Sequence, residues 1–267
     1  MNRRSFLKVG LALAGNPLSN RLAIAETEHG RFQLEIIASS LEDAMAAHAG
    51  GATRLEVAVH LEKGGFSPPL ELIRTIANEV PIAARIMIRE REGVVLSGSS
   101  ELQRLIEKEQ AAAQFAIDGF VLGFIKGGAI DVGTLRELIA SAPSAHYTVH
   151  NSIEMTADPI ETLKALRAFP QVDRALVGGS TNFKPGAREP LGKRIERLLA
   201  YKEIWENNQR RLLVNGVSVE EIKQVQREAG IREFHLGEQV RTPAEPFPVG
   251  KVDANKVREV VALLSRP

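Results

Sequence analysis

The chain has 267 residues, of which 44% are hydrophobic, so it can form one large domain or two small ones with an ordinary core. Its 34 basic and 33 acidic side chains leave a formal net charge of +1, which excludes the strongly basic surface typical of proteins that bind nucleic acid. Cysteine is absent, which excludes disulfides, thiolate metal sites and cysteine nucleophiles. Any metal ion would have to be held by His, Asp, Glu or Met side chains.

The first 25 residues predict an export signal. Residues 3–8 (RRSFLK) form a twin-arginine motif, residues 9–15 are an apolar run, and residues 23–25 (AIA) have the small-residue pattern of a cleavage site. We expect cleavage after Ala25 and an exported or periplasmic chain of residues 26–267; the alternative is a disordered basic tail on a cytoplasmic protein. No apolar run approaches the roughly 20 residues of a membrane span, so the mature chain is not expected to cross a membrane.

After this signal, short apolar or alternating runs typical of strands take turns with segments that have helical spacing and capping residues. The predicted strands are Phe32–Ser39, Arg54–His60, Ile82–Ile88, Phe120–Ile125, His146–His150, Arg174–Val177, Arg211–Val214 and Glu233–Leu236. The predicted helices are Ser40–His48, Leu70–Glu79, Ser99–Phe115, Leu135–Ala140, Arg188–Asn207 and Asp253–Leu264, with two more that begin at Asp158 and Ser218.

Eight strands that alternate with eight helices predict a single-domain (β/α)8 TIM barrel. An open doubly wound sheet is the alternative, but it would show a glycine-rich turn after the first strand, where this chain has residues 38–42 (ASSLE). The proline-rich segment 242–249 follows the eighth strand and is expected to lie over the barrel mouth.

Polar residues gather at the predicted carboxyl ends of the strands, where barrels of this kind form their active sites. The candidates are Glu35, Glu56, His60, Arg89, Arg91, His150, Asn151, Gly178, Gly179, Ser180, Asn215, Gly216 and His235. Because a buried carboxylate without a partner is costly, we expect Glu35 and Glu56 to meet Arg89 across the barrel.

This pattern allows two interpretations. One is a structural ion-pair network that fills the barrel core. The other is a catalytic pocket in which His150 moves a proton, Glu35 or Glu56 orients it or acts as base, and Arg89 holds an anionic or carbonyl oxygen. The residues expected to bind substrate are then His60, Asn151, Gly179, Asn215, Gly216 and His235.

Two turns have the composition of an anion site. Residues 178–181 (GGST) and 215–218 (NGVS) would expose backbone N–H groups after the sixth and seventh strands, and such groups favour phosphate or carboxylate ligands. The alternative is that the glycines only make tight turns possible. His235 has an equally simple alternative, which is to end the last strand.

Several blocks, taken together, resemble the CutC family, which is named for copper homeostasis. They are residues 34–36 (LEI), 51–56 (GATRLE), 64–68 (GGFSP), 87–91 (MIRER), 119–123 (GFVLG) and 149–150 (VH). The resemblance implies one TIM barrel that self-associates, here as a homodimer, with Glu35, Glu56, Arg89 and His150 around a central pocket that holds a small-molecule ligand.

The chain departs from this family where copper would bind. The family often has cysteines two residues after each glutamate, proposed as copper(I) ligands, and this chain has Ile37 and Ala58 there. Because copper(I) prefers sulfur, it is disfavoured, while a divalent metal such as zinc on His150, His235 and a glutamate stays open. Two functions remain: an acid/base enzyme (lyase, isomerase or hydrolase) for a small polar or anionic substrate, or a copper-binding protein without catalytic activity.

Overall fold

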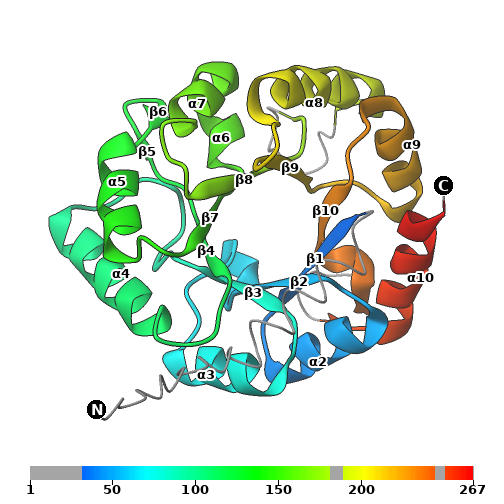
Figure 1. The fold of residues 1–267 in the computed structure, drawn as a ribbon, viewed down its shortest axis with the longest axis horizontal. Helices are drawn as coiled ribbons and strands as arrows, with labels where there is room; N and C mark the ends of the chain where they lie inside the picture. The colour runs from blue at the N-terminus through cyan, green and yellow to red at the C-terminus, as the bar shows by residue number, and fades with distance from the viewer. Residues whose placement is uncertain (1–31, 181–188, 244–249, 267) are drawn as a thin grey trace, which may run out of the picture.

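The computed structural model describes residues 32–180, 189–243 and 250–266. Eight parallel strands close into a barrel in the order β1-β10-β9-β8-β7-β4-β3-β2, and Figure 1 looks down its axis. The barrel strands are β1 (Gln33–Ala38), β2 (Arg54–Val57), β3 (Ala83–Met87), β4 (Gly119–Leu122), β7 (His146–Val149), β8 (Val172–Val177), β9 (Arg211–Val214) and β10 (Glu233–Leu236). The predicted (β/α)8 barrel is confirmed.

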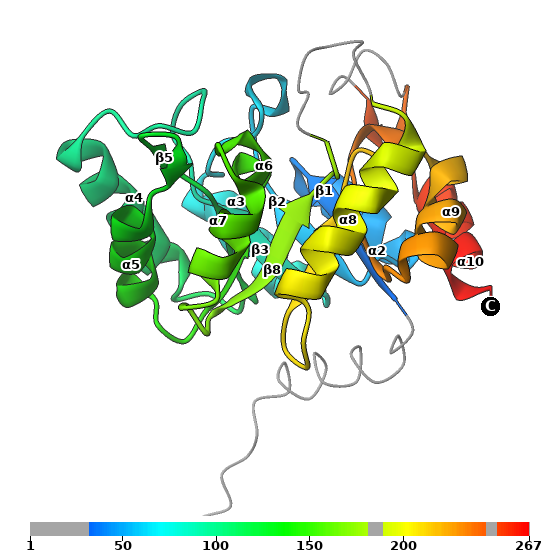
Figure 2. The same cartoon turned by 90° about the horizontal axis from the view of Figure 1, so that it is seen from above.

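Helices surround the barrel (Figures 1 and 2). They are α2 (Leu41–Gly50), α3 (Leu70–Glu79), α4 (Ser99–Ala112), α5 (Val132–Ser141), α6 (Ser152–Met155), α7 (Pro159–Leu166), α8 (Leu191–Trp205), α9 (Val219–Ala229) and α10 (Ala254–Ser265). Several begin where the sequence offers a cap: Ser40 accepts the Asp43 N–H at the start of α2, and Ser218 and Glu221 form a capping box on α9. In the described residues, no helix is long and apolar enough to cross a membrane.

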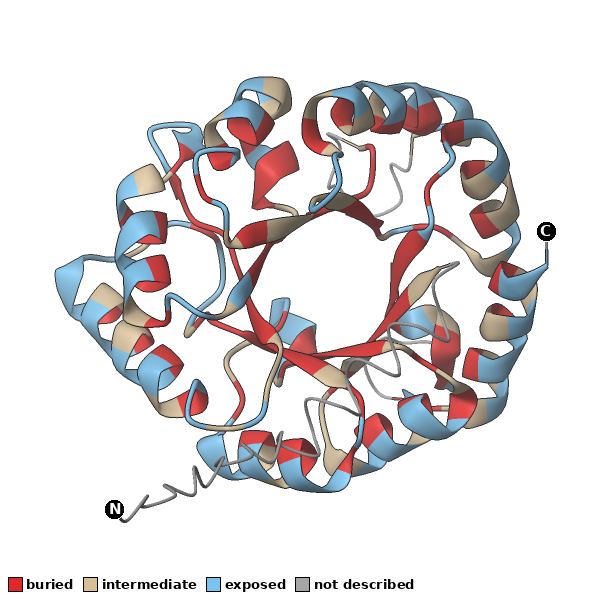
Figure 3. Ribbon diagram, viewed as in Figure 1, coloured by how far each residue is buried: buried red, intermediate tan, exposed pale blue. Residues whose placement is uncertain are grey.

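The alternation of side chains along each strand divides the barrel into two environments. Leu34, Ile36 and Leu55 are fully buried in the apolar layer between strands and helices. Glu35 and Glu56 alternate with them and therefore face the barrel interior, where they are also buried. Figure 3 shows that most of the barrel wall is buried. The polar interior that the sequence indicated is thus built into the strand pattern.

An ion-pair network begins at the amino end of the barrel. The Arg85 guanidinium donates to Asp118 at 2.7 Å and to Asp173 at 2.8 Å, and it also donates to the Thr148 hydroxyl at 2.7 Å. Arg174 then joins Asp173 to Glu233, at 3.0 Å and 2.5 Å, and Glu233 lies 4.0 Å from Arg54 on β2. These contacts agree with the interpretation that ion pairs fill the barrel core. The role of the polar side chains at the carboxyl ends of the strands needs a separate explanation.

The structure differs from the predicted elements in detail. Strand β2 ends at Val57, and the chain then forms a short antiparallel bridge between Val59 and Phe66 around the 3-10 turn η1 (Leu61–Lys63). Two short antiparallel hairpins were not predicted. In one, β5 (Ile125–Lys126) pairs with β6 (Ala129–Ile130). In the other, β11 (Arg241–Thr242), which follows the 3-10 turn η2 (Glu238–Val240), pairs with β12 (Lys251–Val252). The predicted signal, residues 1–25, and residues 244–249 of the predicted cover 242–249 lie outside the described residues.

Candidate active site

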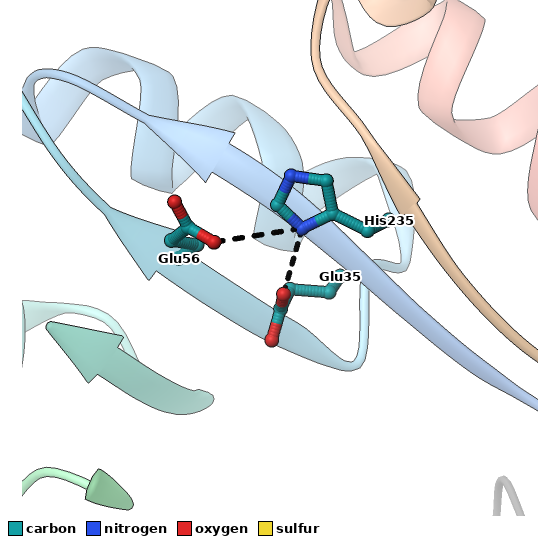
Figure 4. A group of neighbouring side chains, drawn as sticks. All are labelled: Glu35, Glu56 and His235. Atoms are coloured by element: carbon teal, nitrogen blue, oxygen red, sulfur yellow. Dashed lines mark hydrogen bonds and ion pairs between the residues drawn. The ribbon is translucent and has the colours of Figure 1, made fainter. Parts of the chain in front are cut away.

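Three polar side chains from three adjacent strands meet inside the barrel (Figure 4). Glu35 on β1 lies in register with His235 on β10, and Glu56 lies on β2 at the other edge of β1. The Nδ1 atom of His235 lies 2.7 Å from Oε1 of Glu35 and 3.7 Å from Oε2 of Glu56. All three residues are buried, so their charges are only weakly screened by water.

Glu35 is held as an anion by two neighbours, Arg54 and His235. Arg54 donates from Nε to Glu35 Oε2 at 2.5 Å, and His235 shares a proton with Oε1. Burial alone would raise the pKa of Glu35, but the charge of Arg54 and the interactions with His235 outweigh it and hold this pKa well below its ordinary value. Burial alone would lower the pKa of His235. The negative charges of Glu56 and Glu35 outweigh burial, so the pKa of His235 is raised.

Glu56 differs from Glu35 in its hydrogen bonding and its pKa, although both carboxyls are buried. Its Oε2 atom has no hydrogen-bond partner among the described residues. Burial raises its pKa to about 7; His235 and Arg89 oppose this shift while the negative charge of Glu35 adds to it. Glu56 therefore exchanges a proton near neutral pH, whereas Glu35 stays ionised.

The prediction that Glu35 and Glu56 meet Arg89 is wrong: within the described residues Arg89 forms an ion pair with neither, and Arg54 takes the position beside Glu35. Its Nε donates to the carbonyl of Gly65 at 2.8 Å, another of its nitrogens donates to the carbonyl of Gly64, and its guanidinium lies 5.9 Å from the ring centre of Phe66. Arg89 thus supports the loop after β2. Its positive charge still acts on Glu56 and on His150.

His150 directly follows β7 and is buried. The backbone N–H of Ser152 donates to His150 Nδ1 at 3.2 Å, and Nε2 has no hydrogen-bond partner in the part of the chain that the structure describes. Burial and the nearby charge of Arg89 lower the pKa of His150 to about 3, so the ring is neutral. Because Nδ1 accepts a hydrogen bond, the proton of the neutral ring lies on Nε2.

The residues expected to bind substrate fall into two groups. The Asn215 side chain donates to Asn151 Oδ1 at 2.9 Å, which joins the ends of β9 and β7, and Gly216 follows with a positive φ of 64°. His60, in contrast, lies outside this group. Strand β2 ends three residues before it, its backbone is left-handed, and its side chain is 58% exposed.

Arg54 is the member of the cluster that sequence reasoning missed. It lies two residues before Glu56 on the same strand, so the alternation that placed Glu56 inside the barrel also places Arg54 there. That signal was present in the sequence.

The same three residues have the spacing of a metal site. Ligand atoms of Glu35, Glu56 and His235 all lie within 4.8 Å of one another. However, Glu35 and His235 are at hydrogen-bond distance, and Arg54 neutralises the other Glu35 oxygen, so a cation would have to displace a proton and compete with a guanidinium. The arrangement is that of a hydrogen-bonded ion pair.

Copper(I) fits the described residues poorly. Ile37 and Ala58, at the two positions where the resemblance implies cysteine in other members, lie in a small apolar cluster with Leu61, Met87 and Val121. This cluster contains one thioether and no thiolate, whereas copper(I) requires soft sulfur ligands.

Comparison with known proteins gives consistent results. A sequence profile of the CutC family matches residues 32–240. A CutC family protein of Xylella fastidiosa (strain Temecula1) is 28% identical over 245 residues, covering 87% of this chain and 89% of the relative. One from Mesorhizobium japonicum is 27% identical and covers 76% of each chain.

Solved structures agree with the barrel. A CutC protein of Streptococcus agalactiae, whose name links it to copper homeostasis, superimposes with a TM-score of 0.68 at 25% identity, covering 77% of this chain and 98% of that one. A phosphoribosylanthranilate isomerase of Thermotoga maritima has a TM-score of 0.53 at 14% identity, covering 86% of this chain and 96% of that one, and this similarity concerns the fold alone.

Proposed function

The chain belongs to the CutC family, and we propose that the mouth of its barrel is an acid–base catalytic site for a small polar or anionic substrate. The observation that carries the proposal is Glu56. It is a buried carboxyl with a pKa raised to about 7 by burial, and one of its oxygens has no hydrogen-bond partner within the described residues. A general base works best when its pKa lies near the working pH.

In this proposal Glu56 takes a proton from the substrate and later returns it. Near pH 7 a large fraction of Glu56 is ionised, so the carboxylate can accept a proton from carbon or from a hydroxyl group. The protonated form then gives the proton back to another atom, which completes an isomerisation or assists the departure of a leaving group. Both steps move one proton and need no further reagent.

His150 supplies the complementary group. Its neutral ring carries a proton on Nε2, and that atom has no partner among the described residues. A neutral imidazole N–H can donate a hydrogen bond to a substrate oxygen that gains negative charge when a neighbouring proton is removed. His150 is thus proposed as a hydrogen-bond donor and not as the group that removes the proton.

Glu35, His235 and Arg54 are proposed as positioning residues. Glu35 holds His235 at 2.7 Å, and Arg54 compensates the Glu35 charge, so the ring stays beside Glu56 with a raised pKa. The charge of His235 in turn limits how far burial raises the Glu56 pKa. Without this arrangement Glu56 would be protonated and inactive as a base at neutral pH.

The proposal is tested by proton exchange. Wild-type protein is incubated in D2O with small sugars, hydroxy acids and keto acids, and deuterium entering a carbon–hydrogen position is followed by NMR. We expect at least one compound to exchange, with the rate falling about 100-fold or more in Glu56→Gln and in His150→Phe, the usual range for loss of acid–base assistance. The matched control is Glu62→Gln, which removes an exposed carboxyl in the loop after β2.

Exchange that persists in Glu56→Gln would overturn the assignment of the base. Exchange in no compound would remove the support for catalysis and leave the copper-binding alternative that the family name carries. That alternative predicts tight, saturable binding of copper(I), which the oxygen and imidazole donors of the mouth do not favour.

A further inference from the structure

The turn after β8 contains a carboxyl group that belongs to the chain itself. Glu154 on α6 is buried, and its Oε2 accepts the backbone N–H of Gly178 at 2.7 Å. The backbone N–H groups of Gly179 and Ser180 also favour the ionised form, but burial outweighs these donors and raises the pKa of Glu154 to about 7, so the group is an anion above neutral pH. Three successive N–H groups beside one carboxyl group form the arrangement by which backbone turns bind phosphate or carboxylate ligands.

The turn is rigid because helix α8 packs directly on it. Gly179 has a positive φ of 70°, and a Cβ atom there would lie 2.5 Å from the carbonyl oxygen of Arg194. Arg194 is also buried, and its Nε donates to the carbonyl of Gly178 at 2.9 Å, which brings a guanidinium beside the turn. The N–H groups are therefore fixed in direction before any anion arrives.

The fit of Glu154 to this turn is incomplete. Its second carboxylate oxygen, Oε1, is buried and has no hydrogen-bond partner in the described parts of the chain. A well-satisfied structural carboxylate would use both oxygens. The anion site is thus built by the backbone and by Arg194, and Glu154 reaches into it from a neighbouring strand end.

We propose that residues 178–180 form an oxyanion site for a small carboxylate or phosphate, which Glu154 fills from within the chain. Removal of the Glu154 carboxylate then opens the site to an external anion of the same chemistry. The wild-type chain binds no ligand phosphate at this turn. One last step rests on the acid–base site proposed above. The substrate of that site has no phosphate group that binds at the turn after β8.

The test measures anion binding to Glu154→Ala, without reference to activity. Melting temperatures are measured at pH 8 in sodium formate, acetate and phosphate against sodium chloride of equal ionic strength. We expect formate or acetate to raise the melting temperature of Glu154→Ala saturably, by about 3 °C or more at a hundredfold excess over the dissociation constant. Wild type should respond no more than it does to chloride.

Two variants control for charge and shape. Glu161→Ala removes an exposed carboxylate on α7 that pairs with Lys164, so it matches the change in net charge without touching the turn. Glu154→Gln keeps an oxygen in the turn and should not bind formate. In 15N-labelled Glu154→Ala, the amide signals of Gly178 and Gly179 should move with the formate titration, which locates the bound anion.

The proposal is overturned if Glu154→Ala responds to formate no more than Glu161→Ala does, or if wild type responds equally. If Glu154→Ala does not fold in chloride, it is purified in formate: folding there supports the proposal, and failure in both salts counts against it. Since no outcome depends on Glu56, a failed deuterium-exchange test would leave this result standing, and the reverse also holds.

Discussion

Glu56 and Glu35 are both buried in one barrel mouth, yet their neighbours drive their pKa values in opposite directions. Glu35 has an arginine at 2.5 Å, whereas Glu56 has an oxygen with no hydrogen bond and lies 3.7 Å from the His235 ring. Burial dominates where compensation is weak, so the proton goes to Glu56. This difference separates a residue that can exchange a proton from one that only carries charge.

The raised pKa of Glu56 predicts a pH-dependent stability. A carboxyl whose pKa rises from 4.5 to about 7 on folding adds stability below pH 4.5, and this contribution is lost as the pH rises through 7. His235, whose pKa is also raised, shifts stability in the same direction. Glu56→Gln should therefore gain stability relative to wild type between pH 5 and pH 8, by about 1–3 kcal/mol.

Urea unfolding at several pH values measures this difference in the free energy of unfolding. The exposed Glu62→Gln serves as the control, and its difference from wild type should stay flat over the same range. A constant difference for Glu56→Gln would mean that Glu56 keeps an ordinary pKa in the folded protein.

Arg54 and Glu35 should behave as a coupled pair. Arg54→Met removes the arginine partner of a buried carboxylate and leaves Glu35 with His235 alone, so it is expected to cost about 3–5 kcal/mol of unfolding free energy. Adding Glu35→Gln removes that charge, so the double variant should recover part of the loss. Denaturation of the four proteins in a double-mutant cycle gives the coupling, and additive losses would contradict it.

At this scale, the sequence indicated which residues face the barrel interior but not which ones touch. Alternation placed Glu35 and Glu56 inside, and the positions after β3 and β7 gave Arg89 and His150. The partner of Glu35 depends on strand register, because Arg54 lies opposite it across β1 and β2. Register around a closed barrel is set by all eight strands together, so no local pattern reveals it.

Among the elements, the loop after β2 shows how Arg89 affects the site indirectly. Val59 and Phe66 exchange backbone hydrogen bonds of 3.0 and 2.6 Å at the base of this loop, and Arg89 binds two carbonyls within it. The alternating pattern of residues 54–60 continues past the true end of β2, which is why the sequence predicted a longer strand. Pairing with β3 stops at Val57, and Gly64 and Gly65, both with positive φ, then turn the chain.

Arg89→Lys should loosen this loop. A lysine cannot donate to both carbonyls in the fixed geometry of a guanidinium, so amides of residues 59–67 are expected to exchange with D2O about tenfold faster. Hydrogen exchange with mass spectrometry measures this. Arg91→Lys is the matched control, since Arg91 is exposed and donates to Val95 outside the loop. Equal exchange in both variants would show that Arg89 does not support the loop.

Over the whole molecule, the first and last parts of the described chain are joined by one buried carboxylate. Asp43 on α2 accepts the Val252 N–H at 2.9 Å and the Arg241 guanidinium at 3.0 Å, and Arg241 also donates to the Ile37 carbonyl. Burial would raise the Asp43 pKa, but these donors hold it below its ordinary value. Helix α10 packs on α2 so closely that a Cβ atom at Gly50 would lie 2.4 Å from Val257.

If the barrel is one cooperative unit, damage at this junction must weaken every part of it. Asp43→Ala leaves Arg241 buried without its carboxylate and is expected to cost about 3–5 kcal/mol. Trp205, the only tryptophan in the chain, is buried on α8, so its fluorescence reports on a helix outside the junction. Its urea transition should shift together with the far-ultraviolet circular dichroism.

The control is Glu42→Ala, because Glu42 lies beside Asp43 on α2. This change breaks only an exposed ion pair with Lys251, so it should shift both transitions by less than about 1 kcal/mol. A Trp205 transition that stays in place while the circular dichroism shifts would divide the barrel into separately folding parts.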